Sequence, residues 1–155
     1  MADARSSDVV VDVVVDAPAK AVWDAVVDWD RQREWVLGTR LHVVGPRREG
    51  LGTRLEAFTG IGSRAGFTDE MVVVEWEPPS RCVVRHTGRL VRGSGVFEVF
   101  ALPEGRSRFV WSEQLQLPLG PVGRAGWPLV RPAVALGLRA SLRRLARQVA
   151  TDRRS

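Results

Sequence analysis

The chain opens on a valine run whose alternation predicts a strand. Residues 9–15 read VVVDVVV. β-branched side chains crowd a helix but suit a pleated strand, and successive side chains of a strand point to opposite faces. We therefore expect the odd-numbered valines to face the interior, and Asp12 and Asp16 to face solvent.

Two short helices are expected next. Pro18 ends the strand and is tolerated in a first helical turn. The apolar residues at 21, 22, 25 and 26 then fall on one helical face. A second short helix is expected over residues 31–36, and it would carry Trp35. Together the two helices would close one end of a sheet.

From Thr39 onward the apolar pattern changes to a period of two, which is typical of strands. Short turns between these segments favour antiparallel pairing of neighbours. Residues 60–66 are expected to form a glycine-rich connection. The strands are expected over residues 39–43, 50–59, 67–76, 81–87, 91–102 and 107–117.

The C-terminal segment predicts one long helix. Pro128 and Pro132 fit near a helix start but not inside a helix, so we expect a connection over 119–127 and a helix from 128–132 to about Ala150. Its arginines recur every four residues, opposite an apolar stripe. The stripe is expected to contain Val130, Val134, Leu138, Ser141, Leu142, Leu145 and Val149.

This order of elements predicts an α+β fold, in which a curved seven-stranded antiparallel sheet wraps around the long C-terminal helix. One helix covers only about 10–12 Å of width, so the concave face should retain a cavity. Aromatic side chains with a few polar groups are typical of a small-molecule pocket. The aromatic side chains expected to face inward are Phe58, Trp76, Phe97, Phe109 and Trp111, beside the small residues Ala57 and Gly95.

Two polar residues stand out on the predicted inner faces. His86 shares a face with Cys82 and Val84, and Glu113 shares one with Phe109, Trp111 and Leu115. A buried carboxylate must find a donor or become protonated. Glu113 and His86 are therefore candidates for a polar anchor or an acid/base pair, although a charged pair at the sheet rim is the simpler interpretation. Arg54 and Arg131 are further polar candidates for the cavity.

Two tryptophans are candidates for the pocket mouth. Trp35 belongs to the second short helix, and Trp127 precedes the long one. Large aromatic side chains also dominate protein cores, so core packing is the simpler expectation for both.

Composition describes one domain of ordinary size. The chain has 155 residues, 45% of them hydrophobic, which suffices for a core. We expect a single domain over residues 8–150 between loose termini at 1–7 and 151–155. No apolar run approaches the roughly 20 residues of a membrane span, and the start of the chain lacks the apolar core of a signal peptide. We therefore expect a cytoplasmic protein.

The net charge of +5 comes almost entirely from arginine. The arginines are scattered and no nucleic-acid motif frames them, so no nucleic-acid partner is expected. The row of Arg139, Arg143 and Arg147, with Arg144, could meet anionic lipid heads. A solvated helix face is the simpler expectation. The oligomeric state is left open.

No cofactor is expected from the motifs. Gly60 and Gly62 begin a dinucleotide-like loop, but the third glycine falls at Gly66, one residue too late. Neither His42 nor His86 has a carboxylate at metal-ligand spacing. The single cysteine, Cys82, forbids an internal disulfide.

Several segments resemble the SRPBCC or START-like superfamily, in particular its polyketide cyclase/dehydrase-like members. They are the first strand with its Asp16–Ala19 and Val22-Trp23, WDRQREW (29–35), EWEPPSRCVVRHTG (75–88), GRSRFVW (105–111) and the closing helix. The resemblance covers about residues 8–150 and implies the helix-grip fold. It leaves the function open, because the superfamily holds lipid carriers, hydrophobic-ligand binders, aromatase/cyclases and oxygenase subunits.

Three functions remain open on this basis. The first is binding of a small hydrophobic molecule, lipid-like or polycyclic, in the cavity. The second is an aromatase/cyclase-like enzyme with a buried acid/base pair and neither metal nor nucleotide. The chain has no tyrosine, so a phenolic acid is excluded there. The third is a module that binds an apolar peptide or a membrane surface.

Overall fold

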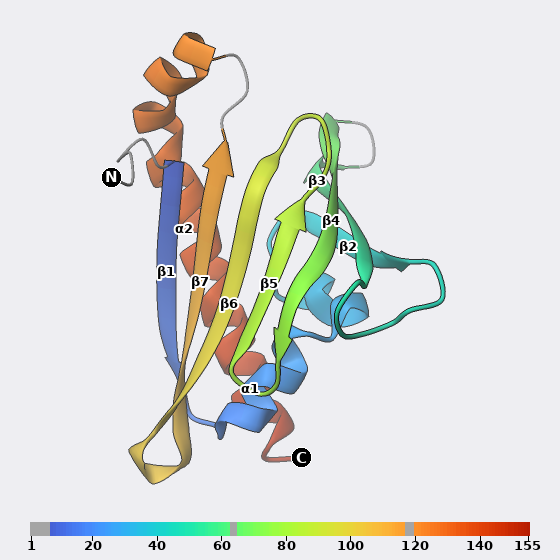
Figure 1. Ribbon diagram of the computed structural model, residues 1–155. Helices are drawn as coiled ribbons and strands as arrows, with labels where there is room; N and C mark the ends of the chain where they lie inside the picture. The colour runs from blue at the N-terminus through green and yellow to red at the C-terminus, as the bar shows by residue number, and fades with distance from the viewer. Residues whose placement is uncertain (1–6, 63–64, 117–119) are drawn as a thin grey trace, which may run out of the picture.

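The computed structural model describes residues 7–62, 65–116 and 120–155 (Figure 1). The first six residues, Ser63 and Arg64 in the expected 60–66 connection, and Leu117 at the end of the last expected strand lie outside the described residues. Seven strands form one antiparallel sheet in the order β1-β7-β6-β5-β4-β3-β2. Its strands are β1 (Ser7–Val15), β2 (Thr39–Val44), β3 (Arg54–Ile61), β4 (Ala65–Glu77), β5 (Arg81–His86), β6 (Arg92–Leu102) and β7 (Arg106–Gln116).

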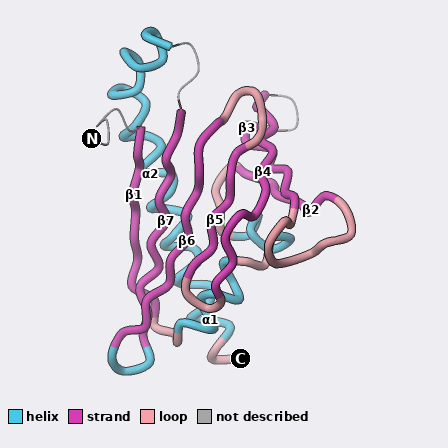
Figure 2. Tube along the Cα trace, viewed as in Figure 1, coloured by secondary structure: helices cyan, strands magenta, loops and turns pink. Residues whose placement is uncertain are grey.

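Helices cover one side and one end of this sheet. Figure 2 shows the strands as one layer, with the long helix α2 (Gly120–Asp152) running diagonally behind it. The helix α1 (Ala19–Val26) and the 3-10 helix η1 (Trp29–Glu34) lie between β1 and β2. A single 3-10 turn, η2 (Pro103–Gly105), closes the β6–β7 hairpin. The α+β helix-grip architecture expected from the sequence is therefore confirmed.

The first strand follows its predicted alternation. Val9, Val11 and Val15 are buried, Val13 is half-buried, and both aspartates are exposed. The register joins β1 to β7 over its whole length, from Ser7 opposite Leu115 to Val15 opposite Ser107. This alternation places the valines on the face that packs against α2.

The third strand is shorter at its start than the sequence predicted. Gly50 and Gly52 both have positive φ, 85° and 83°, and form a turn before β3 begins at Arg54. Glycine adopts this left-handed region without steric strain. At the other end, β3 extends to Ile61, so part of the expected 60–66 connection is strand.

A β-bulge changes the faces of the fourth strand. The register between β4 and β5 shifts between Val73 and Glu75, so that Val74 is the additional residue. Before the bulge the odd-numbered residues Asp69, Met71 and Val73 are buried. After it, Trp76 packs against Trp23 of α1 in an edge-to-face pair with ring centroids 5.2 Å apart.

The segment between α1 and β2 differs slightly from the prediction. The second helix is a 3-10 helix that begins two residues earlier, at Trp29, and Trp35 directly follows it as a fully buried side chain. Asp28 caps this helix by accepting from the Arg31 backbone N–H. The amide of Gln32 donates to the Val26 carbonyl at 2.8 Å and joins η1 to the end of α1.

The expected start of the long helix was wrong. α2 begins at Gly120, and Pro128 and Pro132 lie inside it. Each proline removes one hydrogen bond to the carbonyl four residues earlier. This part of the helix projects past the end of the sheet (Figure 1), where water can solvate the freed carbonyls. Val130, expected on the buried stripe, is 52% exposed there.

The C-terminal half of α2 supplies the part of the helix that enters the core. Its buried residues are Ser141, Leu142, Leu145 and Val149, which agree with the predicted stripe. Within the described part of the chain, no helix is both long and apolar enough to cross a membrane.

Candidate functional site

A cavity of about 430 Å³ lies between the sheet, η1 and α2. This volume is within the range of roughly 300–1,000 Å³ that is usual for small-molecule pockets. Of the residues predicted to line a ligand site, four line this cavity: Phe97, Trp111, His86 and Glu113. The rest of the wall is mainly aliphatic and includes Val36, Leu41, Leu55, Ala57, Met71, Val84, Val91, Leu115, Val134 and Leu138.

Three ionisable side chains form a row in this wall. His86 of β5 stands between Asp69 of β4 and Glu113 of β7. Its Nδ1 lies 2.7 Å from Asp69 Oδ2, and its Nε2 lies 3.1 Å from Glu113 Oε2. Both ring nitrogens of the imidazole are therefore engaged by carboxylates.

The neighbouring strands position the carboxylate of Glu113. Trp111, two residues earlier on the same face of β7, donates its Nε1–H to Glu113 Oε1 at 2.7 Å. Gly95 of β6 is the register partner of Glu113. A Cβ at Gly95 would lie 3.0 Å from Glu113 Oε1 and 3.1 Å from Val84 Cγ2. The missing side chain thus leaves room for the carboxylate against β6.

Burial and charge act in opposite directions on His86. The three side chains are 10%, 6% and 13% exposed for Asp69, His86 and Glu113. Burial disfavours the imidazolium, but hydrogen bonds to both carboxylates and their negative charges outweigh it, and they raise the pKa of His86 to about 9. At neutral pH the ring is therefore protonated and donates to Asp69 and Glu113.

Asp69 was missed by the sequence analysis. It occupies the same face as Met71 and Val73 before the bulge, so the alternation in 67–73 was sufficient to place it inside. Its Oδ1 is buried and has no hydrogen-bond partner among the described residues. The candidate site thus has two carboxylates around one imidazole.

The expectation that Phe58 faces the interior was wrong. Leu55 and Ala57 line the cavity, so the even-numbered residues of β3 lie on the outer face. There the guanidinium of Arg40 lies over the Phe58 ring, 5.7 Å from its centroid. Arg54 shares this outer face and is exposed.

Trp35 and Phe109 belong to the core beneath the cavity. Both are fully buried, and their rings meet edge to face with centroids 6.3 Å apart. Trp35 also packs on Trp111 at 5.9 Å. The cavity lining includes neither Trp35 nor Phe109, so they support its aromatic wall from behind.

The two helix candidates also lie away from the cavity lining. Trp127 is half-buried on α2 and packs against the edge of the core. Arg131 is exposed, and its Nε donates to the Asp8 carbonyl at 3.1 Å. Arg131 therefore contacts the start of β1 instead of the interior.

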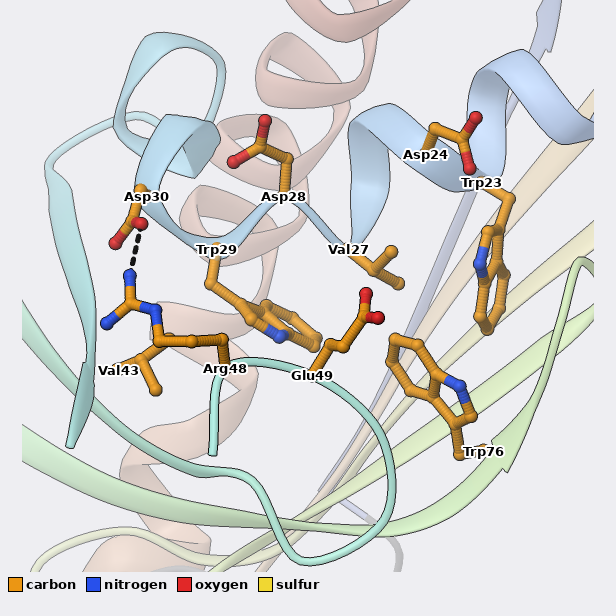
Figure 3. A pocket seen from close by; sticks show the side chains of 10 residues that line it. All are labelled: Trp23, Asp24, Val27, Asp28, Trp29, Asp30, Val43, Arg48, Glu49 and Trp76. Carbon is orange, nitrogen blue, oxygen red and sulfur yellow. Dashed lines mark hydrogen bonds and ion pairs between the residues drawn. The ribbon is translucent and has the colours of Figure 1, made fainter. Parts of the chain in front are cut away.

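Trp76 lines a second pocket, which we call the outer pocket and which has a volume of about 370 Å³. It lies between α1, η1 and the segment after β2 (Figure 3). Trp29 lines both the outer pocket and the cavity. The charged residues of the outer pocket are Asp24, Asp28, Asp30, Arg48 and Glu49, with Arg48 bound to Asp30.

The described residues offer no arrangement of side chains for a metal centre. In the described ranges, no group of three or more histidine, cysteine, aspartate and glutamate side chains is arranged to hold a metal ion. Cys82 is fully buried and free, and burial raises the pKa of its thiol to about 12. It is therefore a neutral core residue at physiological pH.

Comparison with known families agrees with the fold. The chain matches the model of a family described as polyketide cyclase / dehydrase and lipid transport over residues 6–150. It belongs to this family, within the SRPBCC superfamily. A comparison with the curated proteins gives no match.

Solved structures of the same shape include the protein TTHA0849 from Thermus thermophilus, with a TM-score of 0.73 and 21% identity, covering 94% of this chain and 98% of that one. The Zhui aromatase/cyclase from Streptomyces sp. R1128 has a TM-score of 0.72 and 16% identity, covering 92% and 93%. The di-domain aromatase/cyclase StfQ of the steffimycin pathway has a TM-score of 0.72 and 14% identity, covering 97% of this chain and 53% of that one. At these identities the likeness concerns the fold alone.

Proposed function

We propose that this protein binds a small, mainly apolar molecule in the cavity, with a polar group of the guest at the Asp69–His86–Glu113 row. The supporting observation is the combination of a wall that is largely aliphatic and aromatic with one buried polar row. Apolar burial at about 25 cal/mol per Å² supplies affinity. The row supplies orientation, since polar groups placed sparsely in an apolar pocket fix the pose of a ligand.

Gly137 of α2 offers a test of the cavity itself. It lines the cavity, and a Cβ built on it meets nothing within 4 Å. A phenylalanine at this position would fill space that the guest needs. Gly126 on the same helix is equally free of neighbours but does not line the cavity, so Gly126→Phe is the matched control.

The experiment measures binding of the neutral apolar dye N-phenyl-1-naphthylamine by fluorescence. The wild type and Gly126→Phe are expected to bind it alike, and Gly137→Phe at least tenfold more weakly. Native mass spectrometry of the purified protein then identifies a co-purified guest by its mass. Equal affinities of all three proteins would place the dye elsewhere and contradict the proposal.

A second candidate is a cyclase- or dehydratase-like enzyme, and the row itself favours it. The carboxylate of Glu113 faces the cavity and can take a proton from a carbon next to a carbonyl group. His86, protonated and held by Asp69, keeps that carboxylate oriented. The family description names both cyclases and lipid transport, and therefore supports both candidate functions. The similar structure from Streptomyces is an aromatase/cyclase, which supports the second candidate.

The variant Glu113→Gln separates catalysis from binding. A glutamine keeps the shape and can accept from Trp111 while its amide faces a neutral His86, but it cannot take up the proton. Turnover of a poly-carbonyl substrate is expected to vanish while dye affinity stays within about threefold. Turnover that persists in Glu113→Gln would exclude this carboxylate as the base.

A further inference from the structure

The polar groups of the cavity wall differ in how much hydrogen-bonding capacity they leave for a guest. Ser141 Oγ donates to the Gly137 carbonyl at 2.9 Å, and the amide of Gln32 donates to Val26. The hydroxyls of Thr39 and Thr59 lie 3.0 Å apart and form one hydrogen bond. One of their two hydroxyl protons is therefore used, and the other remains available to a guest. Most donors of the wall are thus already engaged within the protein.

The acceptors of the wall keep more capacity. A carboxylate has about four lone-pair positions, and Glu113 uses one on each oxygen, toward Trp111 and His86. Asp69 Oδ1 is buried and has no partner among the described residues. A buried acceptor without a partner is unfavourable, and the free lone pairs of Glu113 lie in the cavity wall, so a donor brought by a guest would be favourable at this end of the cavity.

The charge of the row also favours a guest that brings a hydrogen-bond donor. Two carboxylates and one imidazolium give a net charge of −1 when all are ionised. The chain is rich in arginine, yet among the described residues no arginine or lysine lines the cavity. The one cation of the row, His86, is already bound by both carboxylates. An anionic head group would therefore be desolvated beside Asp69 and Glu113 without a free cation to pair with, which is strongly unfavourable.

The indole of Trp29 does not supply the missing donor. Its Nε1 has no hydrogen-bond partner within the part of the chain that the structure describes. Figure 3 shows this nitrogen on the edge of the ring that faces Arg48 and Glu49. The cavity side of Trp29 is therefore apolar.

We propose that the guest presents a hydrogen-bond donor, a hydroxyl or an ammonium group, to Glu113, and that the cavity rejects molecules with a carboxylate head. This inference rests on the proposed function, because it specifies the head group of the apolar guest. It excludes free fatty acids as guests and admits long-chain alcohols, phenols and amines.

Three probes with the same ten-carbon chain test the head group: 1-decanol, decylamine and decanoate. Each is titrated at pH 7 against the wild-type protein loaded with N-phenyl-1-naphthylamine. Decanol and decylamine are expected to displace half of the dye at concentrations at least tenfold lower than decanoate. In Glu113→Gln the preference for decylamine over decanoate is expected to fall at least fivefold, whereas the exposed-site control Glu56→Gln keeps it.

The outcomes distinguish the two proposals. Decanoate that displaces the dye as well as decanol, in a wild type that binds the dye, overturns the head-group inference and leaves apolar binding standing. A wild type that binds neither the dye nor any of the three probes contradicts the proposed function itself. The wild-type comparison is sufficient on its own if Glu113→Gln does not fold.

Discussion

The cavity and the outer pocket share Trp29 as a wall and contain similar ionisable groups, yet water reaches them very differently. In the outer pocket the ion pair of Arg48 and Asp30 has side chains that are 56% and 60% exposed. In the cavity the side chains of the row are at most 13% exposed. Interactions between charges strengthen as solvent is excluded. The same kind of contact should therefore matter much more for stability and chemistry in the cavity.

Of the changes compared between the two pockets, removing the imidazole of His86 should give the largest loss of stability. His86→Ala leaves two buried carboxylates without their shared cation, and breaking a buried ion pair on one side is unfavourable by about 3–5 kcal/mol. Urea unfolding followed by tryptophan fluorescence measures the loss. The control is His42→Ala, because His42 is 61% exposed and 3.6 Å from Glu56; it should change stability by less than about 0.5 kcal/mol. Equal losses in both variants would mean that the row is no more than a surface ion pair.

Raising the pH should lower the free energy of unfolding through the buried row of the cavity and not through the outer pocket. The pKa of His86 rises from 6.5 to about 9 on folding, so its stabilisation is complete below pH 6.5 and is lost as the pH rises toward 9. The loss is on the order of a few kcal/mol. It can be measured as the urea midpoint between pH 6 and pH 9.5.

Two features of the chain make this pH profile readable. It has no tyrosine and a single lysine, so few other side chains titrate in the window. Cys82 contributes a separate loss only above about pH 9, because burial moves its pKa from 9.0 to about 12. His86→Gln should flatten the profile below pH 9, and Cys82→Ala should flatten it above. A wild-type profile that is flat from pH 6.5 to 9 is incompatible with a buried imidazolium.

A smaller effect is expected from adding one methyl group beside Glu113. Gly95→Ala places a Cβ about 3 Å from the carboxylate and from Val84. Overpacking of this kind is unfavourable by about 1–3 kcal/mol, and it should also weaken dye binding by moving Glu113. Gly126→Ala, in open space on α2, should instead stabilise the helix by up to about 1 kcal/mol. The pair is compared by thermal unfolding, where shifts of the same sign would contradict this account.

The smallest effect belongs to the outer pocket. Arg48→Ala removes the exposed ion pair with Asp30, and such pairs contribute about 0–1 kcal/mol. Any loss should also shrink in high salt, because exposed charges are screened. A salt-independent loss above about 2 kcal/mol in urea unfolding would show that the two pockets are energetically alike.

Much of the fold could be predicted because alternation and helical periodicity are local properties of the sequence. The inner faces predicted for β5 and β7 are correct. They place His86 and Glu113 on the same side of the sheet, where the two side chains meet across β6. The third strand was ambiguous, since apolar residues stand at both Ala57 and Phe58, and neighbouring residues of a strand cannot share a face. Only the pairing with β2 and β4 decides between them.

Other features depend on tertiary structure, and their local signals were misleading or in conflict. The start of α2 could not be found from proline rules, because the lost hydrogen bond and the ring clash disfavour proline inside a helix, yet α2 contains Pro128 and Pro132. Alternation places Asp69 on the inner face of β4, but its charge argued against burial, because charged residues are normally exposed. Its burial follows from His86 on the adjacent β5, a partner 17 residues away.

The bulge at Val74 bears on how other members of the family are compared with this chain. A relative that lacks the extra residue must be aligned with a gap inside β4. Without the gap, every position from Glu75 to Glu77 would be matched to a residue on the opposite side of the sheet, and Trp76 would be equated with a solvent-facing position. Numbering transferred from such a relative is therefore dependable up to Val73 and must be shifted by one beyond it.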